Sequence, residues 1–319
     1  MKDGMSRRGF LASGAAAGLG LMAAGRAGAA PFKTTLHKAM IGPAKEDLFK
    51  KWKDAGFEGC ECRQADVTPD QAAKAREMAE RVGIKIHSVL RGWMSFNSTN
   101  PKAVEGSIQK VATTLRAAKA YGADAILVVP CRVGGVMPQP WEFDYEFDPK
   151  TARVTRVAAG DNAKYAAYIQ AQNHATESSR AALRKLIPVC EETGVKIACE
   201  NVWNNLWVKP DLFAAFIRSV DSPWVGAYFD VGNHVKYAPP ERWIAELGKK
   251  LLKVHIKDFK LKPDGHGGNW AKIREGSVDW PAVRKALDDV GYNGWLTNES
   301  GGLSLEELSR RFDLIIAGK

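Results

Sequence analysis

Four short apolar runs stand out in the C-terminal half of the chain: VKIACE (195–200), WVGAYFD (224–230), LLKVH (251–255) and GWLTNE (294–299). Each run ends on a residue that can bind a cation, and these residues are Glu200, Asp230, His255 and Glu299. Runs rich in Val, Ile, Leu and aromatic residues are typical of β-strands that are covered on both faces. If the four strands are parallel neighbours, their last side chains meet at the edge where α/β barrels carry their active sites.

The four strand-end residues supply three carboxylates and one imidazole. This ligand set consists mainly of oxygen donors, which Mn²⁺, Mg²⁺ and Co²⁺ prefer and Zn²⁺ tolerates. Any one of these residues, taken alone, is accounted for as an ordinary polar residue that caps a turn. Four in succession, each at the expected end of a strand, favour a metal site. We therefore predict one divalent cation bound by Glu200, Asp230, His255 and Glu299.

Strand-like and helix-like segments alternate from Lys33 to the end of the chain. Four further apolar runs precede those quoted above, namely TTLHKAMI, FEGCEC, IKIHSVL and AILVVP. Amphipathic segments are expected to form helices over residues 45–56, 70–82, 101–121, 162–193, 211–220, 240–248, 281–290 and 304–316. Eight strand–helix pairs predict a closed (β/α)₈ TIM barrel in one domain rather than a doubly wound sheet.

The first thirty residues have the pattern of an export signal. Residues 6–30 read SRRGFLASGAAAGLGLMAAGRAGAA, with twin arginines at Arg7 and Arg8 and a small-residue cleavage site at Ala27–Ala29. This order resembles a twin-arginine signal peptide. The alternatives are a disordered basic N-terminus or a membrane anchor, but the apolar stretch is short and rich in Gly and Ala. We predict a signal peptide over 1–30, a barrel domain over 31–319, and a periplasmic or otherwise exported protein with no membrane span after signal removal.

The charge of the chain does not indicate a nucleic-acid-binding surface. Of the formal net charge of +10, the first thirty residues carry +3, which leaves +7 for the rest. The remaining basic residues are scattered over expected helix surfaces, without the interleaved aromatic residues of a nucleic-acid groove. We therefore expect no nucleic-acid partner.

The five cysteines form no CxxC pair and mostly lie in apolar runs, so buried free thiols are expected: Cys60, Cys62, Cys131, Cys190 and Cys199.

Two insertions interrupt the alternation of strands and helices. Residues 131–160 follow the fourth strand and are aromatic and rich in Gly and Pro, so they form either a lid over the site or an edge hairpin, of which we favour the lid. Residues 258–277 follow the seventh strand. Their glycines at 265, 267 and 268 do not have the spacing of a phosphate-binding loop and are interpreted as turns.

The segments IACEN, YFDVGN, VHIKD and EGSVDWPAVRKALDDVGYNGWLTNES together resemble the xylose isomerase-like TIM barrels. This superfamily contains sugar isomerases, ketose 3-epimerases, inosose dehydratases and endonuclease IV. The resemblance covers nearly all of the chain after residue 30. In ketose 3-epimerases the metal ligands are a Glu, an Asp, a His and a Glu on strands five to eight, which correspond to Glu200, Asp230, His255 and Glu299. The endonuclease IV branch needs further His ligands, and the fourth run, VVPCRV, has none.

The resemblance implies proton transfer on a small-molecule carbohydrate. In the epimerases the two metal-binding glutamates also form the acid/base pair, here Glu200 and Glu299, on opposite faces of the substrate. The alternative chemistry is that of a lyase or dehydratase, in which β-elimination on a 3-keto-sugar or 3-keto-glycoside follows the same proton abstraction. The sequence does not separate these two reactions. A non-catalytic carbohydrate-binding barrel is disfavoured because both glutamates are present. A homo-oligomer is compatible with the sequence.

Four further residues are candidates for substrate binding. His87 ends the third strand, where relatives place a substrate-facing His, although a core histidine is the alternative. His234 is favoured over Asn233, because the epimerases carry a His three residues after the Asp and here it is displaced by one. Lys257 either binds a substrate hydroxyl or supports Glu200. Glu61 matches a family Glu near the sugar, or it pairs with an arginine, Arg63 or Arg91.

Tryptophans are plentiful in the segments expected at the mouth of the barrel. Of the ten in the chain, five fall on such loops: Trp93, Trp141, Trp203, Trp207 and Trp270. Most tryptophans in proteins are core residues. Several on one face, however, suit stacking against a sugar ring, including a substrate larger than a monosaccharide.

Overall fold

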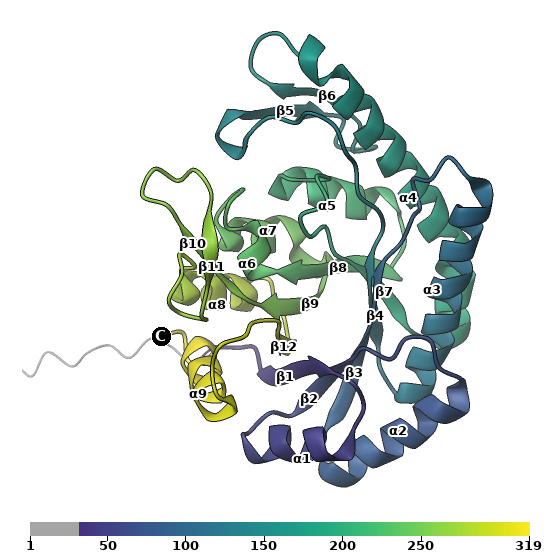
Figure 1. Cartoon of the computed structure of the whole chain (residues 1–319), viewed down its shortest axis with the longest axis vertical. Helices are drawn as coiled ribbons and strands as arrows, with labels where there is room; N and C mark the ends of the chain where they lie inside the picture. The colour runs from purple at the N-terminus through teal and green to yellow at the C-terminus, as the bar shows by residue number, and fades with distance from the viewer. Residues whose placement is uncertain (1–31) are drawn as a thin grey trace, which may run out of the picture. The chain divides into compact units, whose positions relative to one another are not determined.

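The computed structural model describes residues 32–319, and Phe32–Lys319 form one compact unit. Eight parallel strands close into a barrel in the order β1-β12-β9-β8-β7-β4-β3-β2 (Figure 1). The strands are β1 (Leu36–Gly42), β2 (Gly59–Cys62), β3 (Lys85–Trp93), β4 (Ala125–Val129), β7 (Lys196–Cys199), β8 (Val225–Asp230), β9 (Leu251–Ile256) and β12 (Gly294–Asn298). The predicted (β/α)₈ TIM barrel is therefore confirmed, whereas the signal peptide expected over residues 1–30 lies outside the described residues.

Helices follow the barrel strands and surround the barrel (Figure 1). They are α1 (Glu46–Asp54), α2 (Pro69–Val82), α3 (Pro101–Tyr121), α4 (Ala166–Thr193), α5 (Pro210–Ser219), α6 (Val231–His234), α7 (Pro240–Leu247), α8 (Trp280–Asp289) and α9 (Leu305–Ile316). Their apolar faces pack on the outside of the strands, and this shell holds most of the hydrophobic core. The single-turn helix α6, which begins directly after β8, matters most for the site.

Capping chemistry explains why several predicted helix boundaries agree with the structure. Thr68 forms a capping box with Gln71 at the start of α2. The side chain of Asn100 accepts a backbone N–H at the start of α3, and a proline occupies the first turn. Gly122 ends α3 with a φ of 73°, a left-handed conformation that favours glycine.

The inside of the barrel contains an unusual number of polar groups. A small apolar cluster of Leu127, Val129, Ala198 and Tyr228 lies there. Hydrogen bonds also cross the interior between strands that are not neighbours. Tyr228 on β8 donates to Glu61 on β2, and His87 on β3 contacts Thr297 on β12. Barrel interiors are usually filled by branched apolar side chains, so these polar groups indicate a functional site rather than packing alone.

Both insertions form antiparallel hairpins outside the barrel (Figure 1). Strands β5 (Phe143–Phe147) and β6 (Val154–Ala158) lie within the first insertion, after the short 3₁₀ helix η1 (Pro140–Glu142). This segment therefore contains a hairpin, which is a sheet of its own and not an edge of the barrel. Strands β10 (Asp258–Leu261) and β11 (Gly268–Ala271) form the second hairpin, and its glycines at 265 and 267 adopt positive φ in the turn. Trp141 stacks on His266 with 3.8 Å between ring centroids, which joins the two insertions.

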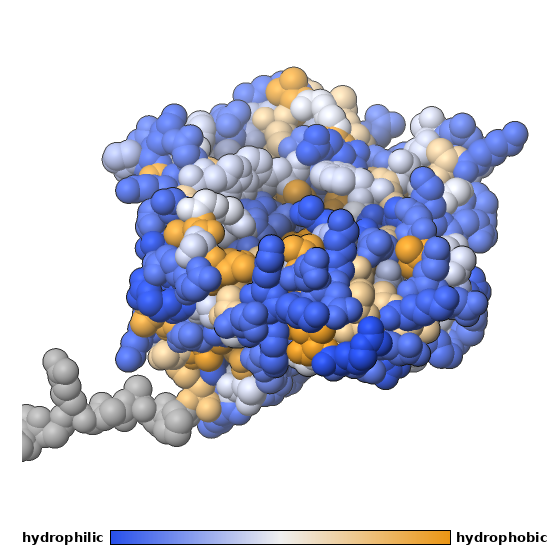
Figure 2. Space-filling view, turned by 60° about the horizontal axis from the view of Figure 1, so that its bottom comes forward, coloured by the Kyte–Doolittle hydropathy of each residue, from blue (hydrophilic) through white to orange (hydrophobic). Residues whose placement is uncertain are grey.

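Three further features concern the surface, the cysteines and the helices of the described residues. The face shown in Figure 2 is mostly hydrophilic, with scattered apolar residues. All five cysteines are free and buried, as predicted. Across residues 32–319, no helix is both long enough and apolar enough to cross a membrane.

Candidate metal centre

The four predicted ligands meet at the C-terminal ends of neighbouring strands. Asp230 ends β8 and is in register with His255 on β9, while Glu200 and Glu299 directly follow β7 and β12. One ligand atom from each residue lies within 4.8 Å of the others. Glu200, Asp230 and His255 are buried and Glu299 is partly exposed. The structure thus brings together all four residues that the sequence placed at strand ends.

Buried polar atoms in this cluster lack hydrogen-bond partners. Among residues 32–319, Asp230 Oδ2, His255 Nδ1 and Glu299 Oε2 make no hydrogen bond of good geometry. They approach other charged groups only at ion-pair distances, such as 3.2 Å between His255 Nδ1 and Glu299 Oε2. Buried lone pairs without partners are rare and call for an ion or a water. Three carboxylates and an imidazole with free lone pairs therefore fit a divalent cation.

Burial and mutual repulsion of the carboxylates shift the pKa values in the cluster. Burial raises the pKa of Glu200 to about 8, and the nearby Glu299 and Asp230 carboxylates add to the shift. Burial likewise raises the pKa of Asp230 to about 7. Burial also acts to raise the pKa of Glu299, but contact with His255 outweighs it and holds this pKa below its usual value. Without a cation, the cluster holds protons that metal binding would displace.

Glu61 lies beneath the cluster rather than at its mouth. Its side chain is fully buried, and Oε2 accepts hydrogen bonds from the Tyr228 hydroxyl and from His255 Nε2, the latter at 3.0 Å. The structure therefore places Glu61 against His255 and Tyr228, in the barrel interior. Pairing with Arg91 does not occur either, because Arg91 pairs with Asp66. A carboxylate on the second nitrogen of a ligating histidine fixes which nitrogen faces the metal.

His87 lies in the barrel interior, where the core-histidine alternative placed it, and not at the mouth. Its side chain is 1% exposed and stacks on Trp295 at 4.8 Å between ring centroids. Nε2 lies 3.2 Å from Thr297 Oγ1. Burial lowers the pKa of His87 well below its ordinary value, so the ring is neutral. This residue fills the barrel interior below the site.

Asn233, not His234, is directed at the cluster. Asp230 caps helix α6 by accepting the backbone N–H of Asn233 at 2.6 Å, so Asn233 turns back over the strand end. Its Nδ2 donates to Glu200 Oε1 at 3.2 Å. His234 points away: it is fully buried, Nδ1 donates to the Asp230 carbonyl at 2.8 Å, and the ring packs on Trp243. The structure therefore places the Asn233 side chain beside Glu200 and the His234 ring away from the cluster.

Lys257 lies at the cluster, as predicted. Its Nζ is 3.0 Å from Glu299 Oε2 and 3.5 Å from Asp230 Oδ2. Burial acts to lower its pKa, but the neighbouring Asp230 and Glu299 carboxylates raise it above its ordinary value. The ammonium also lies 4.8 Å from the centroid of the Trp270 ring. Lys257 therefore contacts Glu299 and Asp230 rather than Glu200.

A cavity of about 430 Å³ opens directly above Glu299. It is lined by Lys257, Trp270, Ala271, Lys272, Glu299, Ser300 and Gly301. This volume falls within the range of small-molecule sites, about 300–1,000 Å³. Trp270 is about half exposed beside it, and Trp203 packs behind Trp270. The cavity therefore joins a buried acidic cluster to an exposed aromatic ring.

The remaining mouth tryptophans have different positions. Trp141 is exposed but stacks on His266, and Trp93 is exposed with Arg132 over its ring at 4.8 Å and does not line the cavity. Trp207 was expected at the mouth but is fully buried. Its Nε1 donates to Thr176 and its ring stacks on Phe216 at 3.7 Å, so that expectation is wrong.

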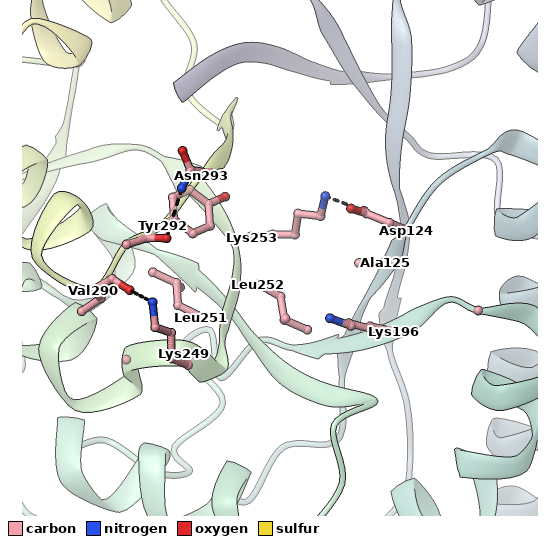
Figure 3. Close-up of a pocket in the computed structure, with 13 residues that line it drawn as sticks. Asp124, Ala125, Lys196, Lys249, Leu251, Leu252, Lys253, Val290, Tyr292 and Asn293 are labelled. Atoms are coloured by element: carbon pink, nitrogen blue, oxygen red, sulfur yellow. Dashed lines mark hydrogen bonds and ion pairs between the residues drawn. The ribbon is translucent and has the colours of Figure 1, made fainter. Parts of the chain in front are cut away.

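A second cavity, of about 290 Å³, lies at the opposite ends of the strands (Figure 3). Lys253 reaches across it to Asp124 with 2.6 Å between Nζ and Oδ1, and Lys196 lies nearby. This ion pair closes the floor of the barrel. None of the predicted site residues lines this cavity. The predicted site residues therefore lie at the opposite end of the barrel from this cavity.

Asp258 has a positioning role that the sequence analysis did not assign. This fully buried carboxylate accepts backbone N–H groups from Phe259, Arg274 and Gly276, and the indole N–H of Trp280. A Cβ atom at Gly276 would lie 2.0 Å from Asp258 Oδ1, so only glycine fits. Asp258 therefore anchors the hairpin that carries Trp270. The segments VHIKD and EGSVDW contained both partners of this contact, but their pairing required the fold.

Comparisons with known proteins identify the family. Residues 49–311 match the family described as xylose isomerase-like TIM barrel, and the chain belongs to it. A mannonate dehydratase from Thermotoga petrophila is 29% identical over 143 residues, which cover 40% of this chain and 39% of that protein. The chain spans about two fifths of the length of the curated relatives it matches.

Solved structures of similar fold include sugar epimerases. The 3-keto-D-glucoside 4-epimerase of E. coli has a TM-score of 0.63 at 14% identity, covering 89% of this chain and 100% of that one. A D-allulose 3-epimerase from Methylomonas, in complex with D-allulose, has a TM-score of 0.60 at 18% identity over 89% and 91% of the chains. The IolI protein with a bound zinc atom has a TM-score of 0.64 at 18% identity over 87% and 96%. At these identities the likeness establishes the fold alone.

Proposed function

We propose that this member of the xylose isomerase-like TIM barrel family is a metal-dependent sugar isomerase or epimerase. It abstracts a proton beside the carbonyl group of an unphosphorylated keto-sugar or sugar derivative. One observation carries the proposal. Strands β7 and β12 are separated by β8 and β9 in the barrel, so Glu200 and Glu299 reach the cluster from opposite sides. A base on one face and an acid on the other are what exchange of a C–H proton requires.

Four residues would hold the cation: Glu200, Asp230, His255 and Glu299. Their donor set favours Mn²⁺, Mg²⁺ or Co²⁺ and also accepts Zn²⁺. A cation in this position supplies the electrophilic polarisation that makes a C–H beside a carbonyl more acidic. The IolI structure, which has a similar fold, holds a zinc atom, and this is in keeping with a metal-binding member of the fold.

The chain's own residues position the acid/base pair. Asn233 donates to one oxygen of Glu200 and so orients this carboxylate, leaving its second oxygen to take part in proton transfer. Lys257 contacts Glu299 at 3.0 Å and keeps a positive charge beside the carboxylate. The same ammonium borders the cavity above, where it can donate a hydrogen bond to a substrate hydroxyl.

A lyase or dehydratase is the second candidate, and one observation favours it. The matched relative from Thermotoga petrophila is a mannonate dehydratase. Elimination begins with the same proton abstraction by Glu200 or Glu299 and then expels the group β to the carbonyl. Substrates of this kind include 3-keto-sugars and 3-keto-glycosides.

The expected export of the protein supports an unphosphorylated substrate in either case, because sugar phosphates are mainly cytoplasmic metabolites.

A substrate panel in D₂O tests the proposal and separates the two reactions. Mn²⁺-loaded protein is incubated with free ketoses and with 3-keto-glycosides, and products are followed by NMR. Epimerisation or isomerisation places deuterium at the carbon beside the carbonyl, whereas elimination releases the aglycone. Glu200→Gln and Glu299→Gln should each lower the rate by at least about 10²-fold. Glu77→Gln on the exposed face of α2 should leave it unchanged. Turnover without solvent label, in which deuterium placed on the substrate is carried intact to the neighbouring carbon, would instead indicate a hydride shift.

A further inference from the structure

Trp270 presents an exposed aromatic face beside the candidate metal centre. The side chain is 49% exposed although it is large and apolar, and it lines the same cavity as Glu299 and Lys257. Lys257 contacts both neighbours, with 3.0 Å to Glu299 Oε2 and 4.8 Å to the Trp270 ring centroid. Glu200, Asp230 and His255 do not line this cavity, so a ring held against Trp270 within it contacts only Glu299 of the four cluster residues.

The indole of Trp270 is held firmly in place. Trp203 stacks behind it at 4.9 Å and 19°, and Phe259 meets it edge-on at 5.2 Å. Phe259 is also its register partner across the β10–β11 hairpin. The base of this hairpin is fixed by the buried carboxylate of Asp258, which accepts hydrogen bonds from the backbone of Phe259, Arg274 and Gly276. A rigid, half-exposed ring beside a polar cavity binds another ring at low entropic cost.

We propose that the substrate is a glycoside with two rings, of which the second stacks on Trp270. The inference rests on the proposed function, because it names the substrate class of the same site. The sugar ring that reacts lies at Glu200 and Glu299, and the second ring, a sugar or an aromatic aglycone, lies against the indole. Lys257, between the two positions, faces the glycosidic link. The cavity of about 430 Å³ beside Trp270, Lys257 and Glu299 provides space for the second ring.

Binding of unreactive glycosides to the metal-loaded protein tests this inference. Methyl β-D-glucoside offers one ring, whereas phenyl β-D-glucoside and cellobiose offer two, and calorimetry measures their dissociation constants. We expect the two-ring ligands to bind at least about tenfold more tightly than the methyl glycoside, and Trp270→Ala to abolish this preference. Trp270→Phe keeps an aromatic ring and should keep most of the preference. Thermal melting establishes that each variant is folded.

The matched control is Trp93→Ala. Trp93 is 47% exposed, close to the value for Trp270, but it lies outside the cavity lining and is covered by Arg132. It should retain the preference for two rings. Equal binding of one-ring and two-ring ligands by the unmodified protein, no measurable binding of any glycoside, or a preference that survives in Trp270→Ala would each overturn the inference. Glu200→Gln separates it from the proposed function, because this variant should lose turnover yet keep the ring preference.

Discussion

His255 Nε2 lies 3.0 Å from Oε2 of Glu61, and this contact crosses the barrel interior from β9 to β2. Both side chains are buried, and the Tyr228 hydroxyl donates to the same Glu61 oxygen. An imidazole held through Nε2 directs Nδ1 at the other ligands, and Nδ1 lies 3.2 Å from Glu299 Oε2. A cation held by this cluster would therefore meet Nδ1, and Glu61 would set this choice without contacting the cation.

Replacing Glu61 should therefore weaken metal binding without removing a ligand. In Glu61→Gln the side-chain amide can turn its NH₂ group towards His255, which would favour the wrong tautomer. We expect Mn²⁺ affinity to fall by about 10–100-fold, measured by calorimetry with a competing chelator. Tyr228→Phe is the matched control, because it keeps the contact between His255 and Glu61 and should have a smaller effect. Unchanged affinity in a folded Glu61→Gln protein would show that His255 does not need this partner.

Mn²⁺ affinity should rise as the pH increases from 6 to 8. Burial raises the pKa of Glu200 to about 8 and that of Asp230 to about 7 in the metal-free protein. Both groups are therefore largely protonated at pH 6, and a cation must displace these protons to bind. Each displaced proton lowers the affinity up to about tenfold per pH unit below the pKa. Calorimetry in buffers of different ionisation enthalpy counts the protons released. If the Mn²⁺ affinity did not change between pH 6 and 8, the carboxylates of the cluster would not be protonated at pH 6.

Much of the fold could be predicted because its signals are local. Helix α3 begins and ends where the sequence placed it, since Asn100 caps its start and Gly122 its end. The four ligands were predicted for a related reason. Parallel strands end at one edge of the barrel, so a polar residue at the end of each apolar run falls near the others. Neither inference required knowledge of how the strands align.

The residues that were misplaced depend on non-local geometry. An inward-facing side chain on a barrel strand can lie at the mouth or several layers below it, and strand alignment sets this depth. A register shift between Cys60 and Glu61 contributes to placing Glu61 under His255. His87 is likewise inward-facing but lies at the level of Trp295. Trp207 follows β7 in a segment that turns back into the shell between strands and helices. No pattern within these segments indicates how far below the mouth of the barrel a side chain lies.

Export of the protein should depend on the arginine pair near its N-terminus. Arg7 and Arg8 precede an apolar stretch in the arrangement of a twin-arginine signal, and these residues lie outside the part of the chain that the structure describes. Changing both to Lys should leave the protein in the cytoplasm, as measured by cell fractionation and by the absence of processing near Ala29. Arg26→Lys is the control, because it keeps the positive charge and lies outside the pair. Normal export of the double variant would show that another feature directs the protein.

Asn233 and His234 are neighbours in sequence, yet their substitution should have opposite effects. Asn233 donates to Glu200 Oε1, so Asn233→Ala frees one side of the acid/base carboxylate. We expect the turnover rate to fall at least about tenfold, with little change in melting temperature, since a misplaced catalytic group loses rate steeply. His234 is fully buried and packs on Trp243, so His234→Ala leaves a cavity and an unpaired Asp230 carbonyl.

The His234→Ala variant should be destabilised by about 2–4 kcal/mol. It should still turn over substrate at temperatures where it remains folded, because its ring does not reach the cluster. Parallel measurement of melting temperature and initial rate separates the two outcomes. If His234→Ala were stable but inactive and Asn233→Ala fully active, the imidazole rather than the amide would be the group that serves Glu200. The one-residue shift from the epimerase pattern would then leave the substrate contact with histidine.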